Sequence, residues 1–241
     1  MDKLVIIPTY NEKENIEKII RKVLSLPGSF HLLIVDDGSP DGTGNIVKGL
    51  QQEFPEKIHL LERSGKQGLG RAYIAGFKYA LQYPQYQYIF EMDADFSHNP
   101  DDLIRLHDAC ANGADISIGS RYVRGGKLVN WPLDRRFISR GGAIYTQAIT
   151  WMPVSDPTAG FVCYTRNVLD TLPLDKVQFV GYAFQIEMKY RSWKLGFKIK
   201  EVPITFIDRT EGQSKMSKNI VQEAIYGVWK MRGFHKETSR K

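Results

Sequence analysis

The chain has 241 residues, of which 42% are hydrophobic and 25% are charged, a balance typical of a globular protein with a full core. This composition excludes a collagen, a coiled coil and a wholly disordered chain. Two cysteines are too few for a disulfide framework or a zinc site, so we expect both to lie in the core. The longest apolar runs are far shorter than the ~20 residues of a membrane helix, and no signal-peptide pattern opens the chain, which predicts a cytoplasmic location.

The net charge of +6 is distributed unevenly along the chain. Residues 1–120 have a net charge of −5, whereas residues 121–140 and residues 197–241 each have a net charge of +5. Separate basic segments indicate an anionic partner such as a nucleic acid, a phospholipid surface or a phosphorylated substrate. A solvated surface with lysine-rich ends explains the same pattern, so charge alone does not choose among these classes.

Short apolar runs alternate with helical patterns in the first 120 residues, as expected of β–α–β units and a mostly parallel sheet. The predicted strands are Leu4–Ile7, Leu32–Val35, Ile58–Leu61, Tyr88–Met92 and Ile116–Ile118. The predicted helices have apolar side chains at spacings of three and four residues and cover 11–26, 44–54, a segment ending near 83, and 101–110. This order of elements predicts an α/β fold.

The second half of the chain has a less regular pattern. It predicts a basic helix over Asp134–Thr150 interrupted by two glycines, a strand over Phe161–Tyr164, a helix over Phe184–Leu195 and a strand over Ile199–Ile207. Pro203 marks an edge or a bulge in the last of these strands. A final helix is indicated by the apolar stripe Ile220, Ala224, Val228 and Met231. We find no linker or internal repeat, so we expect a single domain.

Acidic and polar residues follow three of the predicted strands, in the segments 8–12, 35–42 and 93–95. Ligands of open parallel sheets bind beyond the carboxyl ends of the strands. Asp93 and Asp95 place two like charges close together there, which is costly unless a cation or ordered donors compensate. A hard divalent cation bound by these carboxylates and by substrate phosphates is the simplest arrangement, although such a D-x-D tripeptide alone also arises by chance.

Other nucleotide-binding and catalytic patterns are absent from the sequence. There is no G-x-x-x-x-G-K-[ST] phosphate loop, and the glycine-rich segment 65–70 follows the third strand and lacks the spacing of a dinucleotide fingerprint. The five histidines have no metal-ligand spacing, and only His98 lies near the acidic pair. No Ser-His-Asp or Cys-His arrangement is indicated. The acidic strand ends therefore remain the best candidates for a site.

Taken in order, these motifs resemble those of glycosyltransferase family 2, carried by Ile6–Glu12, Val35–Ser39 and Met92–Asp95. Further segments are similar to the polyprenol-phosphate mannosyltransferases, the dolichyl-phosphate mannose synthase group: 93–98, 118–126, 130–132, 135–140, 156–161 and 209–215. The resemblance spans about residues 4–232. It implies a GT-A, Rossmann-like α/β fold in which helices flank a mixed, mostly parallel sheet, in one domain over 1–241.

The resemblance also implies inverting transfer of mannose from GDP-mannose to the phosphate of a polyprenol. The nucleotide would bind in a half covering about 1–120 and the acceptor in a half covering about 121–241. The implied catalytic residues are Asp95, Arg121 and Arg135. The residues implied to bind the nucleotide sugar are Pro8, Tyr10, Glu12, Val35, Asp37, Asp93, Ala94, Asp95, Arg121, Arg209 and Lys215. Those implied to bind the acceptor phosphate are Arg121, Arg135 and Ser139.

The implied cofactor is Mg²⁺ or Mn²⁺, held by Asp93 and Asp95. Some members of the group have glutamine where this chain has Ser97, which could still bind the metal through water or its hydroxyl. Because the lipid phosphate is already anionic near neutral pH, the reaction needs cations rather than a general base.

Basic and apolar residues alternate in segment 121–140, a pattern that suits a membrane surface. The apolar residues are Val123, Leu128, Val129, Trp131, Leu133, Phe137 and Ile138. Core packing accounts for each of them equally well. A polyprenol acceptor stays in the bilayer, so the resemblance implies peripheral association with the cytoplasmic face of a membrane, either directly or through an anchoring partner protein.

Two alternative functions stay open. A polyprenyl-phosphate glucosyltransferase that uses UDP-glucose would have the same fold, and no spacing in the sequence separates guanine from uracil. A basic nucleic-acid-binding protein would also explain the net positive charge, and it predicts salt-sensitive binding. Because no recognised nucleic-acid motif is present and the basic segments adjoin sugar-nucleotide motifs, we expect no nucleic-acid partner.

Overall fold

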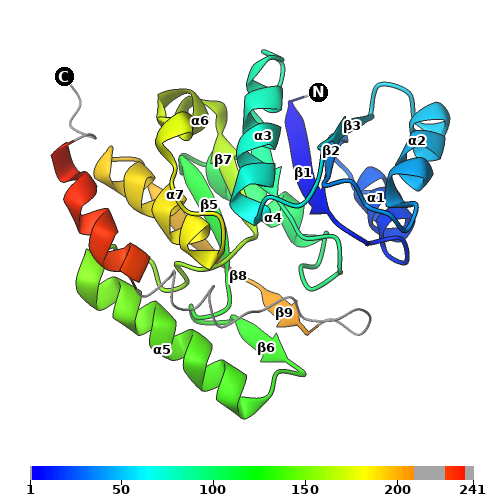
Figure 1. Ribbon diagram of the computed structural model, residues 1–241. Coiled ribbons are helices and arrows are strands. Elements are labelled where there is room, and N and C mark those ends of the chain that lie inside the picture. Colours follow the sequence, from blue (N-terminus) through cyan, green and yellow to red (C-terminus); the bar gives the residue numbers. More distant parts are fainter. Residues whose placement is uncertain (1, 209–225, 237–241) are drawn as a thin grey trace.

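The fold is built around a seven-stranded sheet with helices on both faces (Figure 1). The computed structural model describes residues 2–208 and 226–236. The strand order is β3-β2-β1-β4-β7-β5-β8, and β7 alone in this sheet runs antiparallel to its neighbours. The strands are β1 (Lys3–Thr9), β2 (Phe30–Asp36), β3 (Ile58–Glu62), β4 (Tyr88–Glu91), β5 (Ile116–Ser120), β7 (Val162–Thr165) and β8 (Ile199–Pro203). The predicted mixed, mostly parallel sheet is confirmed.

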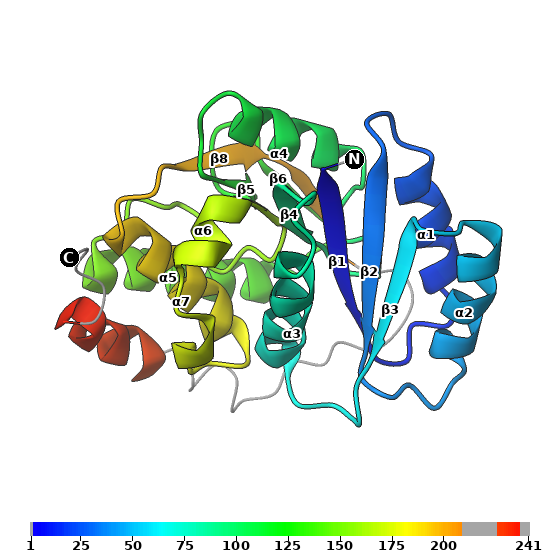
Figure 2. The ribbon, with the colours of Figure 1, turned by 90° about the horizontal axis from the view of Figure 1, so that it is seen from above.

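Each face of this sheet has its own hydrophobic core. One face is covered by α1 (Ile16–Leu24), α2 (Thr43–Glu53) and α4 (Asp102–Ala111), and the other by α3 (Leu69–Leu81), α6 (Arg166–Thr171) and α7 (Tyr182–Lys194) (Figure 2). Successive side chains of β1 alternate between the cores, with Leu4 and Ile6 in one and Val5 and Ile7 in the other. Because both faces are buried, the central strands are continuous apolar runs.

The first helix begins at Ile16, five residues later than the sequence predicts. The residues before it form a loop whose backbone N–H groups donate to side chains of the 39–43 turn. Asn11 donates to Ser39 Oγ at 3.0 Å, and Glu12 donates to Thr43 Oγ1 at 3.1 Å. Asn11 also has a φ of 58°, outside the right-handed helical region. These contacts hold the ends of β1 and β2 together.

Two strands replace the single strand predicted over 199–207. The chain leaves the main sheet after Pro203, at its β8 edge, as the proline suggested. It then forms β9 (Thr205–Ile207), which pairs in parallel with β6 (Lys127–Val129) in a second, two-stranded sheet. The backbone N–H of Ile204 donates to the carbonyl oxygen of Ser120 at 3.0 Å, which fixes the crossing point.

The long helix α5 (Leu133–Thr150) is continuous, so the predicted interruption at Gly141 and Gly142 is wrong. Glycine lowers helix stability by roughly 1 kcal/mol relative to alanine but does not forbid helical angles, and burial of Ala143 and Ile149 offsets that cost.

A helix over 226–232 buries Val228 and Met231, whereas Ile220 and Ala224 lie outside the described residues. The short helices η1 (Leu174–Lys176) and η2 (Gly233–Lys236) complete the fold. Within residues 2–208 and 226–236, no helix is long and apolar enough to span a membrane.

Candidate active site

The carboxyl ends of β1 and β2 form the first part of the candidate site. The buried Asp36 accepts hydrogen bonds from the Thr9 hydroxyl at 2.8 Å and from the backbone N–H of Ser39 at 2.9 Å. Asp36 therefore organises the turn that follows β2. Val35 packs its side chain into a core, so only its backbone can contact a ligand.

Asp37, the other acidic residue at the end of β2, is joined to the loop after β3. Arg63 Nη1 donates to Asp37 Oδ1 at 2.8 Å, and Arg63 Nη2 donates to Gln67 Oε1 at 3.1 Å. Burial raises the pKa of Asp37, and the Arg63 guanidinium opposes that shift. In the same region the Lys66 ammonium lies 5.2 Å from the centre of the Tyr10 ring. Arg63 is not among the site residues predicted from the sequence, where its one signal is its position two residues after the predicted strand Ile58–Leu61.

The D-x-D residues lie in a tight turn after β4. The Asp93 backbone N–H donates to His98 Nδ1 at 3.3 Å, and the Ser97 backbone N–H donates to Asp95 Oδ1 at 3.0 Å. Burial lowers the pKa of His98 to about 4, so its ring is neutral at pH 7 and carries its proton on Nε2. The turn therefore holds the Asp95 carboxylate through its own backbone and fixes Asp93 through the backbone N–H, while Ala94 between them is buried.

These residues fit a hard divalent cation. Among the described residues, no group of three or more histidine, cysteine or acidic side chains could form a complete protein cage. The buried Ser97 Oγ has no hydrogen-bond partner in the described part of the chain, which leaves an oxygen donor beside Asp95. Carboxylate and hydroxyl oxygens suit Mg²⁺ or Mn²⁺, whose remaining ligands are commonly waters and substrate phosphates.

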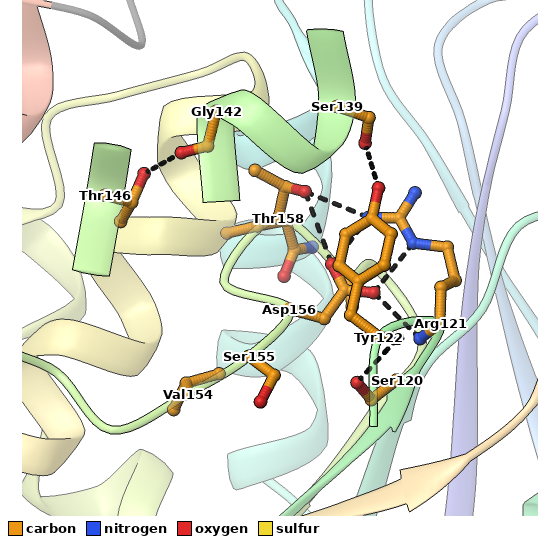
Figure 3. A network of polar contacts seen from close by, with 12 residues as sticks. Ser120, Arg121, Tyr122, Ser139, Gly142, Thr146, Val154, Ser155, Asp156 and Thr158 are labelled. Carbon is orange, nitrogen blue, oxygen red and sulfur yellow. Dashed lines mark hydrogen bonds and ion pairs between the residues drawn. The ribbon is translucent and has the colours of Figure 1, made fainter. Parts of the chain in front are cut away.

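Arg121 lies at the end of β5 in a buried ion pair (Figure 3). Its Nε donates to Asp156 Oδ2 at 2.7 Å, and its Nη2 donates to Asp156 Oδ1 at 2.6 Å and to the Thr158 hydroxyl at 3.0 Å. Asp156 is completely buried and also accepts the Arg121 backbone N–H. Asp156 serves as the counter-ion of Arg121, a role that its sequence position, 35 residues away, did not indicate.

Arg135 and Ser139 lie on α5, close to the Arg121 pair. Arg135 Nη1 donates to both carboxylate oxygens of Asp208 at 2.9 Å, and the Tyr122 hydroxyl donates to Ser139 Oγ at 2.6 Å. The guanidinium groups of Arg121 and Arg135 lie 5.6 Å and 4.2 Å from the Trp131 ring. The other two predicted cations, Arg209 and Lys215, lie outside the described residues.

Trp131 is only 7% exposed, because it packs edge-on against Phe206 between the two arginines. The expectation that it enters a membrane is therefore wrong. Its neighbours Leu133 and Phe137 on α5 are exposed.

Strand β9 lies between the D-x-D turn and Arg121 and contacts both. The His98 ring stacks on Phe161 and meets the Phe206 ring of β9 edge-on at 5.4 Å. The backbone N–H of Ile207 donates to the Ser97 carbonyl at 3.3 Å. Phe206 also lies 5.5 Å from the Arg121 guanidinium. The structure thus brings the D-x-D turn and a pair of arginines to the same end of the sheet.

This fold, with acidic residues in the turns after β1, β2 and β4, belongs to the α/β class, in which ligands bind beyond the carboxyl ends of the strands. More narrowly, the chain belongs to glycosyl transferase family 2, whose family model matches residues 4–172. The predicted GT-A fold and transferase class are confirmed.

Relatives and solved structures resemble the chain over nearly its whole length. It is 46% identical to a polyprenol monophosphomannose synthase of Mycolicibacterium smegmatis, covering 95% of this chain and 87% of that one. It is 45% identical to an undecaprenyl-phosphate mannosyltransferase of Micrococcus luteus, covering 95% and 93%. Two proteins of solved structure share the fold. A mycobacterial protein has a TM-score of 0.71 at 17% identity, covering 96% of this chain and 75% of that one. A mannosyltransferase of Pyrobaculum calidifontis in complex with GDP-Man and Mn²⁺ has a TM-score of 0.58 at 14% identity, covering 99% and 74%.

Proposed function

We propose that this glycosyltransferase transfers mannose from GDP-mannose to the phosphate of a polyprenol, with inversion at the sugar carbon. The names of the two relatives support this reaction. The observation that carries the proposal is the contact of β9 with both His98 of the acidic turn and Arg121. Such a site places the D-x-D carboxylates, which would bind a nucleoside diphosphate through a cation, beside arginines that suit a second phosphate.

The donor would bind along the ends of β1, β2 and β4, in the half of the chain formed by about 1–120. Asp93, Asp95 and Ser97 would hold Mg²⁺ or Mn²⁺, which stabilises negative charge on the departing nucleotide when bound. The residues proposed to contact the nucleotide sugar are Pro8, Tyr10, Glu12, the Val35 backbone, Asp37, Asp93, Ala94, Asp95, Arg121, Arg209 and Lys215.

The acceptor phosphate would bind in the half formed by about 121–241, at Arg121, Arg135 and Ser139. Asp156 orients Arg121 through two hydrogen bonds, and Asp208 does the same for one nitrogen of Arg135. The phosphate is the nucleophile and is anionic near pH 7. The protein therefore needs to hold it in line with the sugar carbon rather than remove a proton from it.

A transfer assay tests the proposed reaction directly. We expect the chain to move radiolabel from GDP-mannose to a short polyprenyl phosphate in the presence of Mg²⁺ or Mn²⁺. Transfer from UDP-glucose with no transfer from GDP-mannose would replace the proposal with the glucosyltransferase alternative.

The donor and acceptor residues can be separated by mutation. Asp37→Ala removes a charged acceptor and its link to Arg63, so we expect GDP to bind about 10-fold more weakly. Arg135→Ala removes a proposed phosphate contact, so we expect turnover on the lipid phosphate to fall while GDP affinity stays unchanged. Calorimetry with GDP and steady-state kinetics measure the two effects. Equal losses of GDP affinity and of turnover in the two variants would contradict the assignment of Asp37 to the donor and Arg135 to the acceptor.

We also propose that the protein associates peripherally with the cytoplasmic face of a membrane, alone or with an anchoring partner. The exposed apolar residues of α5 include Leu133, Phe137 and Ile144, at spacings that place them on one helix face. Trp229, also exposed, belongs to the helix 226–232, and Arg232 of that helix lies 5.4 Å from the exposed Trp151 ring after α5. We propose that these exposed apolar side chains meet the membrane.

Liposome sedimentation tests this membrane surface. We expect binding to increase with anionic lipid and to decrease at ~1 M salt, where the Debye length is about 3 Å. The double variant Phe137→Ala, Trp229→Ala should bind more weakly because apolar insertion is lost, whereas Leu69→Ala, which changes an exposed leucine of α3, should bind normally. Failure of the protein to bind anionic liposomes at low salt would favour recruitment by a partner.

A further inference from the structure

Helix α7 carries an unusual set of polar side chains that are completely or almost completely buried. They are Gln185, Glu187, Lys189, Arg191 and Ser192. A buried charge is costly unless its hydrogen bonds are satisfied. Glu187 and Arg191 pair with each other at 2.8 Å and contact the 176–179 segment. Lys189 faces a different set of neighbours.

The Lys189 ammonium makes three hydrogen bonds to uncharged oxygens. It donates to the Ala159 carbonyl at 2.7 Å, to the Gln185 carbonyl at 3.1 Å and to Gln185 Oε1 at 3.0 Å. An ammonium has three donors, so these contacts use its full capacity. Two of the three acceptors, the Ala159 carbonyl and Gln185 Oε1, belong to residues that are hydrogen-bonded in turn to segments of the candidate site.

The first connection runs from Lys189 through Gln185 to β4. Because Gln185 Oε1 accepts from Lys189, its amide nitrogen faces the other way and donates to Glu91 Oε2 at 2.6 Å. Glu91 is the last residue of β4 and lies two positions before Asp93. The orientation of one amide thus links the lysine to the strand end that carries the D-x-D turn.

The second connection runs from Lys189 through Ala159 to the Arg121 pair. The Ala159 backbone N–H donates to the Asp156 carbonyl at 3.3 Å, which closes a turn over 156–159. This turn carries both Asp156 and Thr158, the side chains that hold the Arg121 guanidinium. Lys189 therefore contacts both Gln185, which is bonded to the end of β4, and Ala159, which belongs to the turn that holds Arg121.

We propose that Lys189 is a positioning residue for sugar transfer, fixing the D-x-D turn through Gln185 and Glu91 and the Arg121 pair through Ala159. The inference rests on the proposed function, because it assigns a donor role to the turn and an acceptor role to the arginine. The lysine touches neither substrate. It sets the distance between the D-x-D turn and the Arg121 guanidinium. A displacement of 1 Å between reacting groups can lower a rate about 100-fold.

Burial acts on the charges of this network as well. It lowers the pKa of Lys189 to about 8 and raises the pKa of Glu91 to about 8, and attraction between the two groups opposes both shifts. Removal of the lysine alone therefore destabilises Glu91, and a test must separate this effect from positioning. The double variant Glu91→Gln, Lys189→Met removes both charges together.

The experiment compares kcat, the KM for each substrate and thermal unfolding in four proteins. We expect Lys189→Met to lower kcat about 100-fold with little change in the KM of GDP-mannose. The double variant should recover much of the Tm but not kcat. Glu187→Gln, Arg191→Met is the matched control, because it removes an equally buried pair from the same helix, and it should keep kcat near the wild-type value despite a lower Tm.

A milder variant keeps the test decisive if these proteins unfold. Gln185→Met removes the amide that joins Lys189 to Glu91 and leaves the contact of Lys189 with the Ala159 carbonyl in place. We therefore expect it to raise the Mn²⁺ concentration needed for half-maximal GDP binding in calorimetry, with the acceptor KM unchanged. Wild-type kcat in the double variant, or an equal loss of kcat in the control pair, would overturn the positioning role. Absence of transfer in the wild-type protein would instead contradict the proposed function, and the calorimetry would still test the connection from Lys189 through Gln185 to Glu91.

Discussion

Asp95→Asn is expected to lower the rate of sugar transfer by about three orders of magnitude while the protein remains folded. The substitution removes a negative charge from the group proposed to hold the divalent cation, and such a cation stabilises transition-state charge by several kcal/mol, at 1.36 kcal/mol for each factor of ten. The carboxylate also accepts the Ser97 backbone N–H, a bond that the asparagine oxygen can retain. Steady-state transfer with radiolabelled donor measures the loss.

Chelation and a surface control complete this experiment. Excess EDTA should abolish transfer by the wild-type protein, and added Mn²⁺ should restore it. Asp101→Asn changes an exposed aspartate paired with Lys22, so its rate should match that of the wild type. Full activity in EDTA would refute the assignment of a metal to Asp93 and Asp95.

Asp156→Ala should destabilise the protein by about 3–5 kcal/mol, because it removes the fully buried carboxylate from its ion pair with the Arg121 guanidinium. The side chain of Asp156 is fully buried and accepts three hydrogen bonds from Arg121. We also expect transfer to fall, since the guanidinium loses the fork that orients it. Urea unfolding followed by circular dichroism measures the change in the free energy of unfolding.

The chain offers a second arginine–aspartate pair as a control. Asp208 pairs with Arg135, but both side chains are about a quarter exposed. Asp208→Ala should therefore lower the free energy of unfolding less than Asp156→Ala does, because water reaches this pair and screens its charges. A similar loss of stability in the two variants would show that burial of Asp156 does not determine its contribution.

The sequence by itself determined the central strands and the acidic edge of the site. Strands β1 and β2 are buried on both faces, so each is a continuous apolar run that only a parallel sheet covered by helices accommodates. In such a sheet the residues directly after the strands share one edge. The positions of Asp37, Asp93 and Asp95 followed from the strand ends, without knowledge of any contact between them.

Only the tertiary structure decided which groups pair and which surfaces remain open. Strand β7 enters the sheet between β4 and β5 in the antiparallel direction, which brings Asp156 to Arg121 across 35 residues of sequence. Trp131 and Phe137 have similar apolar character, yet one is buried between two arginines and the other is 77% exposed. Local sequence patterns predict helices and strands from the periodicity of apolar residues and predict where these elements end. Burial and ion pairing depend on which distant segment lies opposite each residue, and the packing of the whole chain settles that.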